Sequence, residues 1–276
     1  MATTPESDDT LDMETMSLRR DGHVLTVTID HPTSALNAVD ALLHREFADL
    51  FNLLKRGNEA IAAGVRAIVL AGEGPAFSAG GDMDWFPTLR TPEKLNDLRR
   101  EAKQTIWDQL DVEAPIVCAL NGPAVGLGAS IALMCDVIVM ADTAAIIDPH
   151  VQVGLVAGDG GAAIWPLMLG PHAAKRHLML GEPLTASEAL RLGVAAEVCA
   201  AAGVPETARR WADRLAAQPP LAVQGTKLSV NQQLKQSLLT AFDFSTAMEM
   251  PCFHSADHAE AVDAFIEKRP GIYEGR

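Results

Sequence analysis

A histidine and two carboxylates stand close together in an otherwise apolar part of the chain. Residues 146–165 read IIDPHVQVGLVAGDGGAAIW and contain Asp148, His150 and Asp159. An imidazole near its ordinary pKa is the usual general base at neutral pH, and a nearby carboxylate can orient the ring or hold a water molecule. The residue types in this segment are therefore compatible with acid–base chemistry.

Each of these residues also has a purely structural interpretation. His150 is compatible with a hydrogen-bonded core histidine, and Asp159 with the cap of a helix that begins near Gly160. Asp148 is interpreted as a turn residue. A metal site built from Asp148, His150 and Asp159 is the least favoured alternative, so we predict no metal.

Two glycine-rich segments each follow a predicted buried strand. Gly80 and Gly81 come after the strand at 66–72, and Gly126 comes after the strand at 114–122. Glycine lets another group approach the backbone closely, and a helix N-terminus presents unpaired N–H groups. Two such loops side by side would aim two N–H groups at one oxygen, as in an oxyanion hole. The alternative is a pair of ordinary strand–helix turns. Neither loop matches the phosphate-binding pattern GxxxxGK[ST].

Strand and helix patterns alternate in the first part of the chain and give way to helices after Gly170. Strands are predicted at 23–30, 66–72, 114–122 and 136–142, and helices at 40–55 and 91–110. Further helices are predicted at 171–180, 185–192, 205–217, 219–236, 237–249 and 256–268. This order indicates an α/β fold with a helical C-terminal part. No internal repeat is evident in the sequence.

The composition is that of a globular protein with one sizeable core. The chain has 276 residues, of which 48% are hydrophobic and 21% charged. Its formal net charge of −14 argues against nucleic acid or an anionic membrane as a partner. There is no signal-peptide pattern, no long apolar run and no CxxC pair among the four cysteines. We expect a cytoplasmic protein whose residues 1–15 form a disordered acidic tail.

Five segments together resemble the crotonase (enoyl-CoA hydratase/isomerase) superfamily. They occur in that family's order and spacing: ALNA (35–38), AFSAGGDM (76–83), NGPAVGLG (121–128), MCDVIVMAD (134–142) and AFIEKRP (264–270). The resemblance implies a crotonase (ClpP-like) spiral of ββα units over residues 16–215. It also implies a C-terminal helical region for trimerisation, residues 216–276, and hence a homotrimer or a dimer of trimers.

The same resemblance implies the chemistry of the site. The substrate would be a CoA thioester, with no other cofactor required, and its oxyanion would be held by the backbone N–H groups of Gly81 and Leu127. The implied substrate-binding positions are Ala38, Ala79, Gly80, Asp82, Trp85 and Gly126 around the glycine loops, and Phe265 and Lys268 on the last helix, which often serves a neighbouring subunit.

The catalytic positions depart from those of typical hydratases. The two glutamates that hold the attacking water in those enzymes correspond here to Ser130 and His150. We therefore predict that His150 activates water or moves a proton, that Asp159 assists it, and that Ser130 is a third candidate. The alternative for Ser130 is a small residue packed in a helix.

A second resemblance concerns the pattern PHxxxGxVxGDGxxxxWP at 149–166. It is similar to the branch that contains 6-oxocamphor hydrolase, whose members cleave cyclic β-diketones without CoA. In addition, Ser34 stands where relatives often carry the Lys or Arg that binds CoA phosphate. Three hypotheses follow: a hydratase-like lyase (or isomerase) acting on a CoA thioester, a CoA-independent C–C hydrolase working by retro-Claisen cleavage, and a non-catalytic CoA-binding member.

Overall fold

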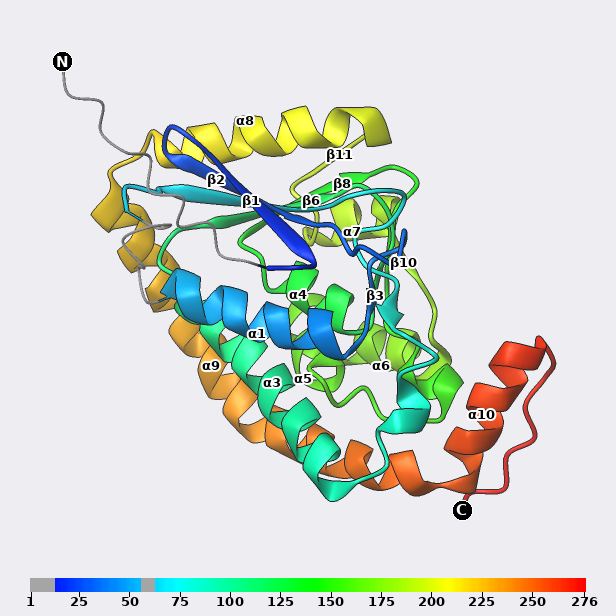
Figure 1. Cartoon of the computed structure of the whole chain (residues 1–276). Helices are drawn as coiled ribbons and strands as arrows, with labels where there is room; N and C mark the ends of the chain where they lie inside the picture. Colours follow the sequence, from blue (N-terminus) through cyan, green and yellow to red (C-terminus); the bar gives the residue numbers. More distant parts are fainter. Residues whose placement is uncertain (1–12, 56–62) are drawn as a thin grey trace.

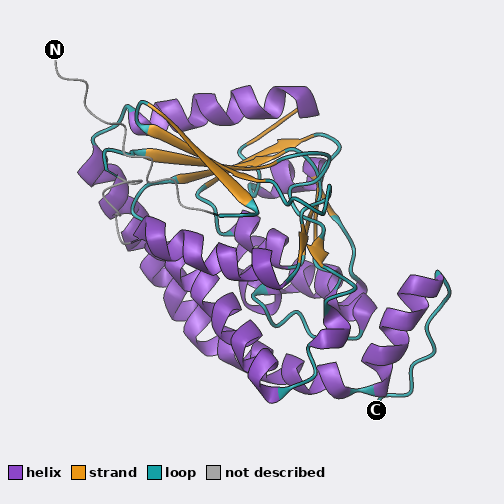
Figure 2. Ribbon diagram, viewed as in Figure 1, coloured by secondary structure: helices purple, strands orange, loops and turns teal. Residues whose placement is uncertain are grey.

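A six-stranded sheet organises the molecule (Figures 1 and 2). The computed structural model describes residues 13–55 and 63–276. In spatial order the strands are β1 (Met16–Asp21), β2 (Val24–Ile29), β4 (Ala67–Gly72), β6 (Ile116–Leu120), β8 (Val137–Ala141) and β11 (Glu197–Cys199). The neighbours from β2 to β11 are parallel, and β1 pairs antiparallel with β2. The long apolar strands are the predicted ones, and β6 is buried along its whole length.

Short strands follow the long ones and stack beside them. They are β3 (Ala38–Val39), β5 (Gly80–Gly81), β7 (Ala124–Val125), β9 (Ala145–Ile147) and β10 (Leu184–Thr185). β3 pairs with β5, β7 pairs with β9, and a parallel bridge from Ser78 to Ala124 joins the two pairs. Each turn of the chain thus contributes a long strand, a short strand and a helix, which confirms the predicted spiral of ββα units.

Helices cover both faces of the large sheet (Figure 2). α8 (Val204–Ala216) lies across one face, where it contacts β4, β6 and β8. The opposite side holds α1 (Ala41–Lys55), α3 (Pro92–Asp111), α4 (Leu127–Leu133), α5 (Gly161–Leu169), α6 (Pro171–Leu180) and α7 (Ala186–Leu192). The chain ends with α9 (Pro220–Glu249), the short turn η4 (Met250–His254) and α10 (Ala256–Glu267).

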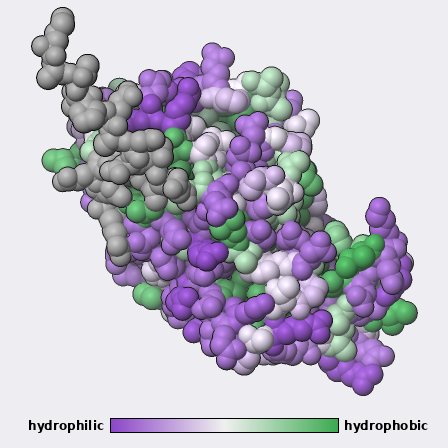
Figure 3. Space-filling view, viewed as in Figure 1, coloured by the Kyte–Doolittle hydropathy of each residue, from purple (hydrophilic) through white to green (hydrophobic). Residues whose placement is uncertain are grey.

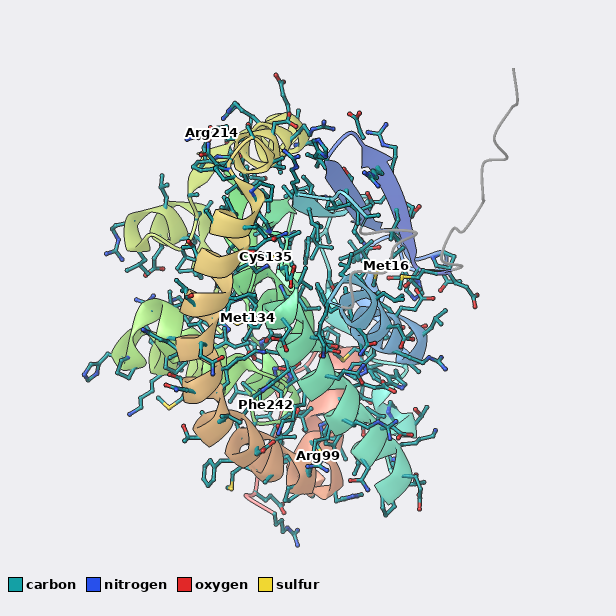
Figure 4. The ribbon with its side chains drawn as sticks, turned by 90° about the vertical axis from the view of Figure 1, so that its left-hand side faces the viewer. Met16, Arg99, Met134, Cys135, Arg214 and Phe242 are labelled. Carbon is teal, nitrogen blue, oxygen red and sulfur yellow. The ribbon has the colours of Figure 1, made fainter. Side chains whose placement is uncertain are left out.

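The long helix α9 runs beside α3 and brings the C-terminal part against the spiral. Phe242 of α9 is labelled in Figure 4. It packs edge-on against Trp107 of α3, with 5.2 Å between the ring centroids. The sequence predicted two helices meeting at 236–237, whereas the structure has one continuous helix. The prediction was wrong because Ser237 is accommodated in the helix: its hydroxyl donates to the carbonyl of Gln233.

The last helix, α10, projects from the body of the molecule (Figure 1). Hydrophobic side chains gather at this end of the surface (Figure 3), where Phe265, Ile266, Ile272 and Tyr273 are exposed. Trimerisation through the C-terminal region stays a prediction.

The N-terminal edge of the sheet departs from expectation. Residues 1–12 of the predicted tail lie outside the described residues. Glu14 and Thr15, however, donate backbone N–H groups to the buried carboxylate of Glu46, so the tail prediction is wrong for these two residues. β1 was also missed, because its sequence MSLRRD has charged residues on an exposed edge and lacks the apolar alternation of an inner strand.

Two further expectations concern the whole chain. All four cysteines are free thiols, as predicted. Within residues 13–55 and 63–276, the helices are too short or too polar to pass through a bilayer.

Asn37 of the ALNA segment ties the first spiral turn to the second. It has a left-handed backbone with φ 52° and is 1% exposed. Its side-chain amide donates to the carbonyls of Glu73, Ala76 and Phe77, and its Oδ1 accepts from the N–H of His31. Asn37 therefore fixes the loop that leads into Gly80 and Gly81.

We predict that Asn37→Ala lowers the free energy of unfolding by about 2–3 kcal/mol, because several buried backbone groups lose a partner. Urea unfolding followed by circular dichroism measures the effect. The matched control is Asn96→Ala at an exposed position of α3, which should change stability by less than about 0.5 kcal/mol. Equal stability of the two variants would contradict the role given to Asn37.

Candidate active site

The stacked short strands bring the two glycine loops into contact. The N–H of Val125 donates to the carbonyl of Ser78, and that of Gly126 to the carbonyl of Ile147. Gly126 has φ 55°, and a Cβ built on it would lie 3.6 Å from Cε1 of His150 and 3.8 Å from Cα of Gly80. The loops and His150 therefore meet at one place, which supports the oxyanion-hole interpretation over that of two unrelated turns.

The two predicted oxyanion donors border the same cavity. Gly81 belongs to β5, and Leu127 is the first residue of α4, so its N–H has no partner within that helix. The backbone of Gly81 is covered by the ring of Phe86, which leaves no room for a side chain at residue 81.

The cavity lies between the glycine loops, α1, α3 and the end of α9, and has a volume of about 90 Å³. A space of roughly 10–15 Å³ on this measure holds one water molecule, so the cavity takes roughly six to nine water-sized groups. Of the predicted site residues, it is lined by Ala79, Gly80, Gly81, Trp85, Gly126, Leu127, His150 and Asp159.

His150 is held by Asp148, which the sequence interpretation had taken for a turn residue. His150 opens the short helix η2 (His150–Val153), and its Nδ1 lies 2.5 Å from Oδ1 of Asp148. The carboxylate accepts, so Nδ1 carries a proton and Nε2 faces the cavity. Asp148 is fully buried. The sequence left two roles open for Asp159, orienting the ring or holding a water molecule; the contact at Nδ1 is made by Asp148, two residues before the histidine.

Two further carboxyl groups face the other ring nitrogen. Oδ2 of Asp159 lies 3.4 Å from Nε2 of His150, and Oε1 of Glu249 lies 4.0 Å from it. The cap position of helix α5 is Gly160, which offers no side chain; the backbone N–H of Gly161 helps to lower the pKa of the Asp159 carboxyl, as expected of a carboxylate at a helix start. Glu249 ends α9, 5% of its side chain is exposed, and it lines the cavity.

The glycines of the segment GDGG make room for these carboxylates. A Cβ at Gly158 would overlap the side chain of Glu249, and one at Gly161 would overlap Oδ2 of Asp148. The hydroxyl of Thr246 donates to the carbonyl of Gly158 and ties α9 to the loop. Residues 146–165 are thus rich in glycine and apolar residues because a buried cluster of charged side chains has to pack against them.

The charges of the cluster set its protonation. Burial acts to lower the pKa of His150, but the charges of Asp159 and Asp148 and their hydrogen bonds raise that pKa well above the ordinary value. Burial acts to raise the pKa of Asp159, but the charge and hydrogen bond of His150 lower it. Burial raises the pKa of Glu249 to about 8, and repulsion from Asp159 and Asp148 adds to the effect. At neutral pH the cluster therefore holds an imidazolium, an ionised Asp159 and a neutral Glu249.

Several predicted site residues lie away from the cavity lining. Ser130 is fully buried in α4, its Oγ faces Gly160, and it does not line the cavity. Asp82 accepts from the N–H of Asp84 and shapes a turn, and Ala38 pairs with Gly80 in the short sheet. Phe265 is exposed on α10 and Lys268 is exposed just after it; neither residue lines the cavity.

Four residues of the site were missed by the sequence analysis. Asp148 was misassigned, and Glu249, His44 and Glu101 were not considered together with it. His44 lines the cavity, and its Nδ1 lies 2.8 Å from Oε2 of Glu101. The Asp-x-His spacing was a usable signal for Asp148. The other three lie in helices far away in sequence, where nothing marks them as neighbours of His150.

A metal centre does not fit the geometry well, although ligand atoms of Asp148, His150 and Asp159 lie within 4.8 Å of one another. Asp148 binds Nδ1, whereas Asp159 faces Nε2. These nitrogens lie on different edges of one imidazole, which normally binds a metal through one of them while the other donates to a carboxylate. The arrangement is that of a hydrogen-bonded acid–base cluster.

The family model described as enoyl-CoA hydratase/isomerase matches residues 19–276. The chain belongs to the enoyl-CoA hydratase/isomerase family. A short-chain-enoyl-CoA hydratase of Clostridium acetobutylicum is 29% identical over 263 residues, covering 94% of this chain and 97% of that one.

Solved structures of family members share the fold. An enoyl-CoA hydratase/isomerase from Mycobacterium paratuberculosis has a TM-score of 0.85 and 33% identity, with 92% of this chain and 99% of that one covered. A β-diketone hydrolase from the cyanobacterium Anabaena, bound to (S)-3-oxocyclohexyl acetic acid, has a TM-score of 0.81 and 30% identity, with coverages of 91% and 98%. Similarity to both kinds of enzyme leaves the reaction to be argued from the site of this family member.

The raised pKa of His150 predicts an effect of Asp148→Asn. The variant keeps an acceptor beside Nδ1 but removes a charge, so the pKa of His150 should fall. Titration of the imidazole signals by NMR measures this, with His150→Gln identifying the signal. Asp142→Asn, at an exposed position, is the control and should leave the titration unchanged. An unaltered His150 titration in Asp148→Asn would argue against the assigned contact.

The raised pKa of Glu249 predicts a pH-dependent stability. Between pH 4.5, its ordinary value, and about 8, the folded chain keeps a proton that the unfolded chain has lost. Stability must therefore fall as pH rises through this window, and His150 contributes in the same direction above its ordinary pKa of 6.5.

In Glu249→Gln the fall in the free energy of unfolding from pH 5 to pH 8 should be smaller than in the wild type. Urea titrations at both pH values give the two differences. Glu113→Gln, at an exposed position, should behave as the wild type does. Parallel pH profiles in all three proteins would mean that Glu249 is ionised in the folded state.

Proposed function

We propose that this protein is an enoyl-CoA hydratase-like lyase that adds water to an α,β-unsaturated CoA thioester. The observation that carries the proposal is the position of His150. It is fixed by Asp148 at one nitrogen, faces Asp159 with the other, and lies beside Gly126 between the glycine loops. A base, an acid and two oxyanion donors are then within one cavity.

The protonation of the cluster suggests how the protons move. The Asp159 carboxylate takes a proton from a water molecule as its oxygen bonds to the β-carbon, and the electron pair of the double bond moves to the thioester as an enolate. The N–H groups of Gly81 and Leu127 bind the enolate oxygen. The His150 imidazolium then gives a proton to the α-carbon, and the proton held by Asp159 passes to Nε2 of His150 across their 3.4 Å contact. Water is thereby added across the double bond, and both groups regain their starting charge.

Glu249 would position the attacking water. A neutral carboxyl group both donates and accepts a hydrogen bond, so it holds water without competing with Asp159 as the base. In this scheme Asp159, His150 and Glu249 replace the pair of glutamates of typical hydratases.

The size of the cavity favours a short acyl group. A volume of about 90 Å³ leaves little space once a thioester carbonyl and a water molecule are in place. The 29% identical relative from Clostridium is named for short-chain substrates, which is consistent with this preference.

Burial of four ionisable groups argues against a non-catalytic role. Asp148, His150, Asp159 and Glu249 would each be stabilised better by water, and their mutual pairing only partly offsets that cost. Catalytic sites are where such perturbed groups cluster. A protein that only bound CoA esters would have no use for them.

Cleavage of a β-diketone is a second candidate, favoured by the charges next to the first glycine loop. Ser34 offers no cation, and Asp82 and Asp84 form the turn after Gly81. These carboxylates would repel the phosphates of CoA. The same cluster would serve this reaction: hydroxide from water bonds to one carbonyl carbon, the C–C bond breaks, and the resulting enolate is protonated. The structural similarity to a β-diketone hydrolase supports this candidate.

A substrate panel tests both candidates. Crotonyl-CoA, dec-2-enoyl-CoA and bicyclo[2.2.2]octane-2,6-dione, whose hydrolysis gives 3-oxocyclohexyl acetic acid, are assayed with the wild type and His150→Gln. We expect turnover of crotonyl-CoA, weaker turnover of the longer ester, and a loss of about 10²–10⁴-fold in kcat/KM in the variant. His172→Gln, at an exposed position of α6, is the control.

The outcomes separate the hypotheses. Turnover of the diketone with no effect on the thioesters would replace the first proposal by the second. Binding of CoA esters without any turnover would favour the non-catalytic member, and wild-type activity in His150→Gln would contradict the assigned role of His150.

A further inference from the structure

A second histidine borders the cavity and has no part in the scheme above. His44 lies on α1 between apolar core residues, with Leu43 and Phe47 fully buried beside it, and is itself 2% exposed. A histidine buried in such surroundings requires compensation for its polar nitrogens. What it contacts therefore indicates what it is for.

Two neighbours fix the ring of His44. Glu101 of α3 binds Nδ1 at 2.8 Å, and the ring of Trp85 lies 5.4 Å away between centroids. Because Glu101 accepts at Nδ1, the other nitrogen, Nε2, is left for the cavity. Within the described part of the chain, this Nε2 has no hydrogen-bond partner. Glu101 and His44 are arranged like Asp148 and His150: a carboxylate orients the ring through Nδ1, and Nε2 faces the cavity.

The charges around the cavity limit what Nε2 of His44 can bind. His44 is close enough to Asp159 for its charge to lower the pKa of that carboxyl. The carboxylates of Asp159 and Glu101 lie near His44, so an anionic group placed at its Nε2 would be repelled. A neutral oxygen would not: imidazole Nε2 accepts from a hydroxyl when neutral and donates to a carbonyl when protonated.

Most of the other residues on this side of the cavity are apolar: Met83, Phe86, Leu98 and Leu155. Arg99, an exposed residue of α3, adds a cation to the lining. The hydroxyl of Thr246 is already committed to the carbonyl of Gly158. A hydrocarbon substrate would displace water from Nε2 of His44 and leave this nitrogen without a hydrogen-bond partner. An oxygenated substrate would supply that partner.

We propose that His44, positioned by Glu101, binds a neutral hydroxyl or keto oxygen in the acyl part of the substrate, remote from the carbonyl held by Gly81 and Leu127. The substrate is then an oxygenated enoyl thioester, and a plain hydrocarbon ester is a poor substitute. This inference rests on the proposed hydration of a CoA thioester and names its substrate class. A site that hydrogen-bonds a substrate oxygen discriminates strongly against the analogue that lacks it.

Three thioesters of equal chain length test the proposal: hex-2-enoyl-CoA, 5-hydroxyhex-2-enoyl-CoA and 5-oxohex-2-enoyl-CoA. In the wild type, kcat/KM for at least one oxygenated ester should exceed that for hex-2-enoyl-CoA by about tenfold or more. His44→Phe, which keeps an aromatic ring and removes both nitrogens, should bring this ratio close to one. His44→Gln, which keeps a polar end, should retain part of the ratio.

Glu101→Gln tests the positioning. It should lower the ratio mainly through a higher KM for the oxygenated ester, since the ring loses its fixed orientation. A purely structural role of the His44–Glu101 pair would lower kcat/KM for all three esters together and leave the ratio unchanged, which would overturn the proposal. Circular dichroism identifies any variant that does not fold, and His44→Gln and Glu101→Gln still report the ratio if His44→Phe is lost.

The failure of this inference is distinguishable from failure of the proposed function. Equal wild-type turnover of all three esters, abolished in His150→Gln, would refute the role of His44 and leave the hydratase proposal intact. Absence of turnover for all three esters in the wild type would refute both.

Discussion

The hydrogen bond between buried Asp148 and Nδ1 of His150 is the constraint on which the site depends. It orients the ring, turns Nε2 toward the cavity and, together with Asp159, keeps the imidazole charged despite its burial. Once this cation is in place, Asp159 remains ionised beside it. Glu249 keeps a proton because burial raises its pKa and repulsion from Asp159 and Asp148 adds to this effect, whereas the charge of His150 acts to lower it. The fixed ring therefore sets the charges of His150 and Asp159, and burial sets that of Glu249.

The fold supplies this constraint by stacking equivalent points of successive spiral turns. The short strands β3, β5, β7 and β9 hold the ALNA segment, the two glycine loops and the Asp148 segment in consecutive layers. Glycines occur where one layer or a carboxylate comes too close for a Cβ, as at Gly80 against Val125 and at Gly158 against Glu249. A substitution in the active site therefore also alters the packing between successive turns of the spiral.

Sequence reasoning reached most of the fold and part of the site. The long strands and most helices have strong apolar patterns, so their placement could be predicted from periodicity. The two-residue strands carry no periodicity, and for this reason the repeated ββα unit was invisible without the family resemblance. His150 and Asp159 stood out as polar residues in an apolar segment, but Glu249 and His44 reside in long helices whose polar residues are mostly solvated, and only tertiary packing by α9 and α1 brings them to the cavity.

Replacement of a glutamate by a histidine changes the net charge that must be buried in the cavity. Two glutamates facing one water must share protons to limit their repulsion, whereas His150 and Asp159 form a pair with no net charge. A neutral pair costs less to bury and leaves a further carboxyl, Glu249, free to stay protonated. The proposed oxyanion donors, Gly81 and Leu127, would be unaffected by this exchange, because they would act through backbone N–H groups that no substitution at residue 150 removes. In the proposed mechanism the scaffold thus keeps enolate stabilisation constant while the acid–base pair varies. That separation explains how one fold serves both water addition to a thioester and water attack on a diketone, with the choice between them left to the charges at the cavity mouth and the polar groups along its walls.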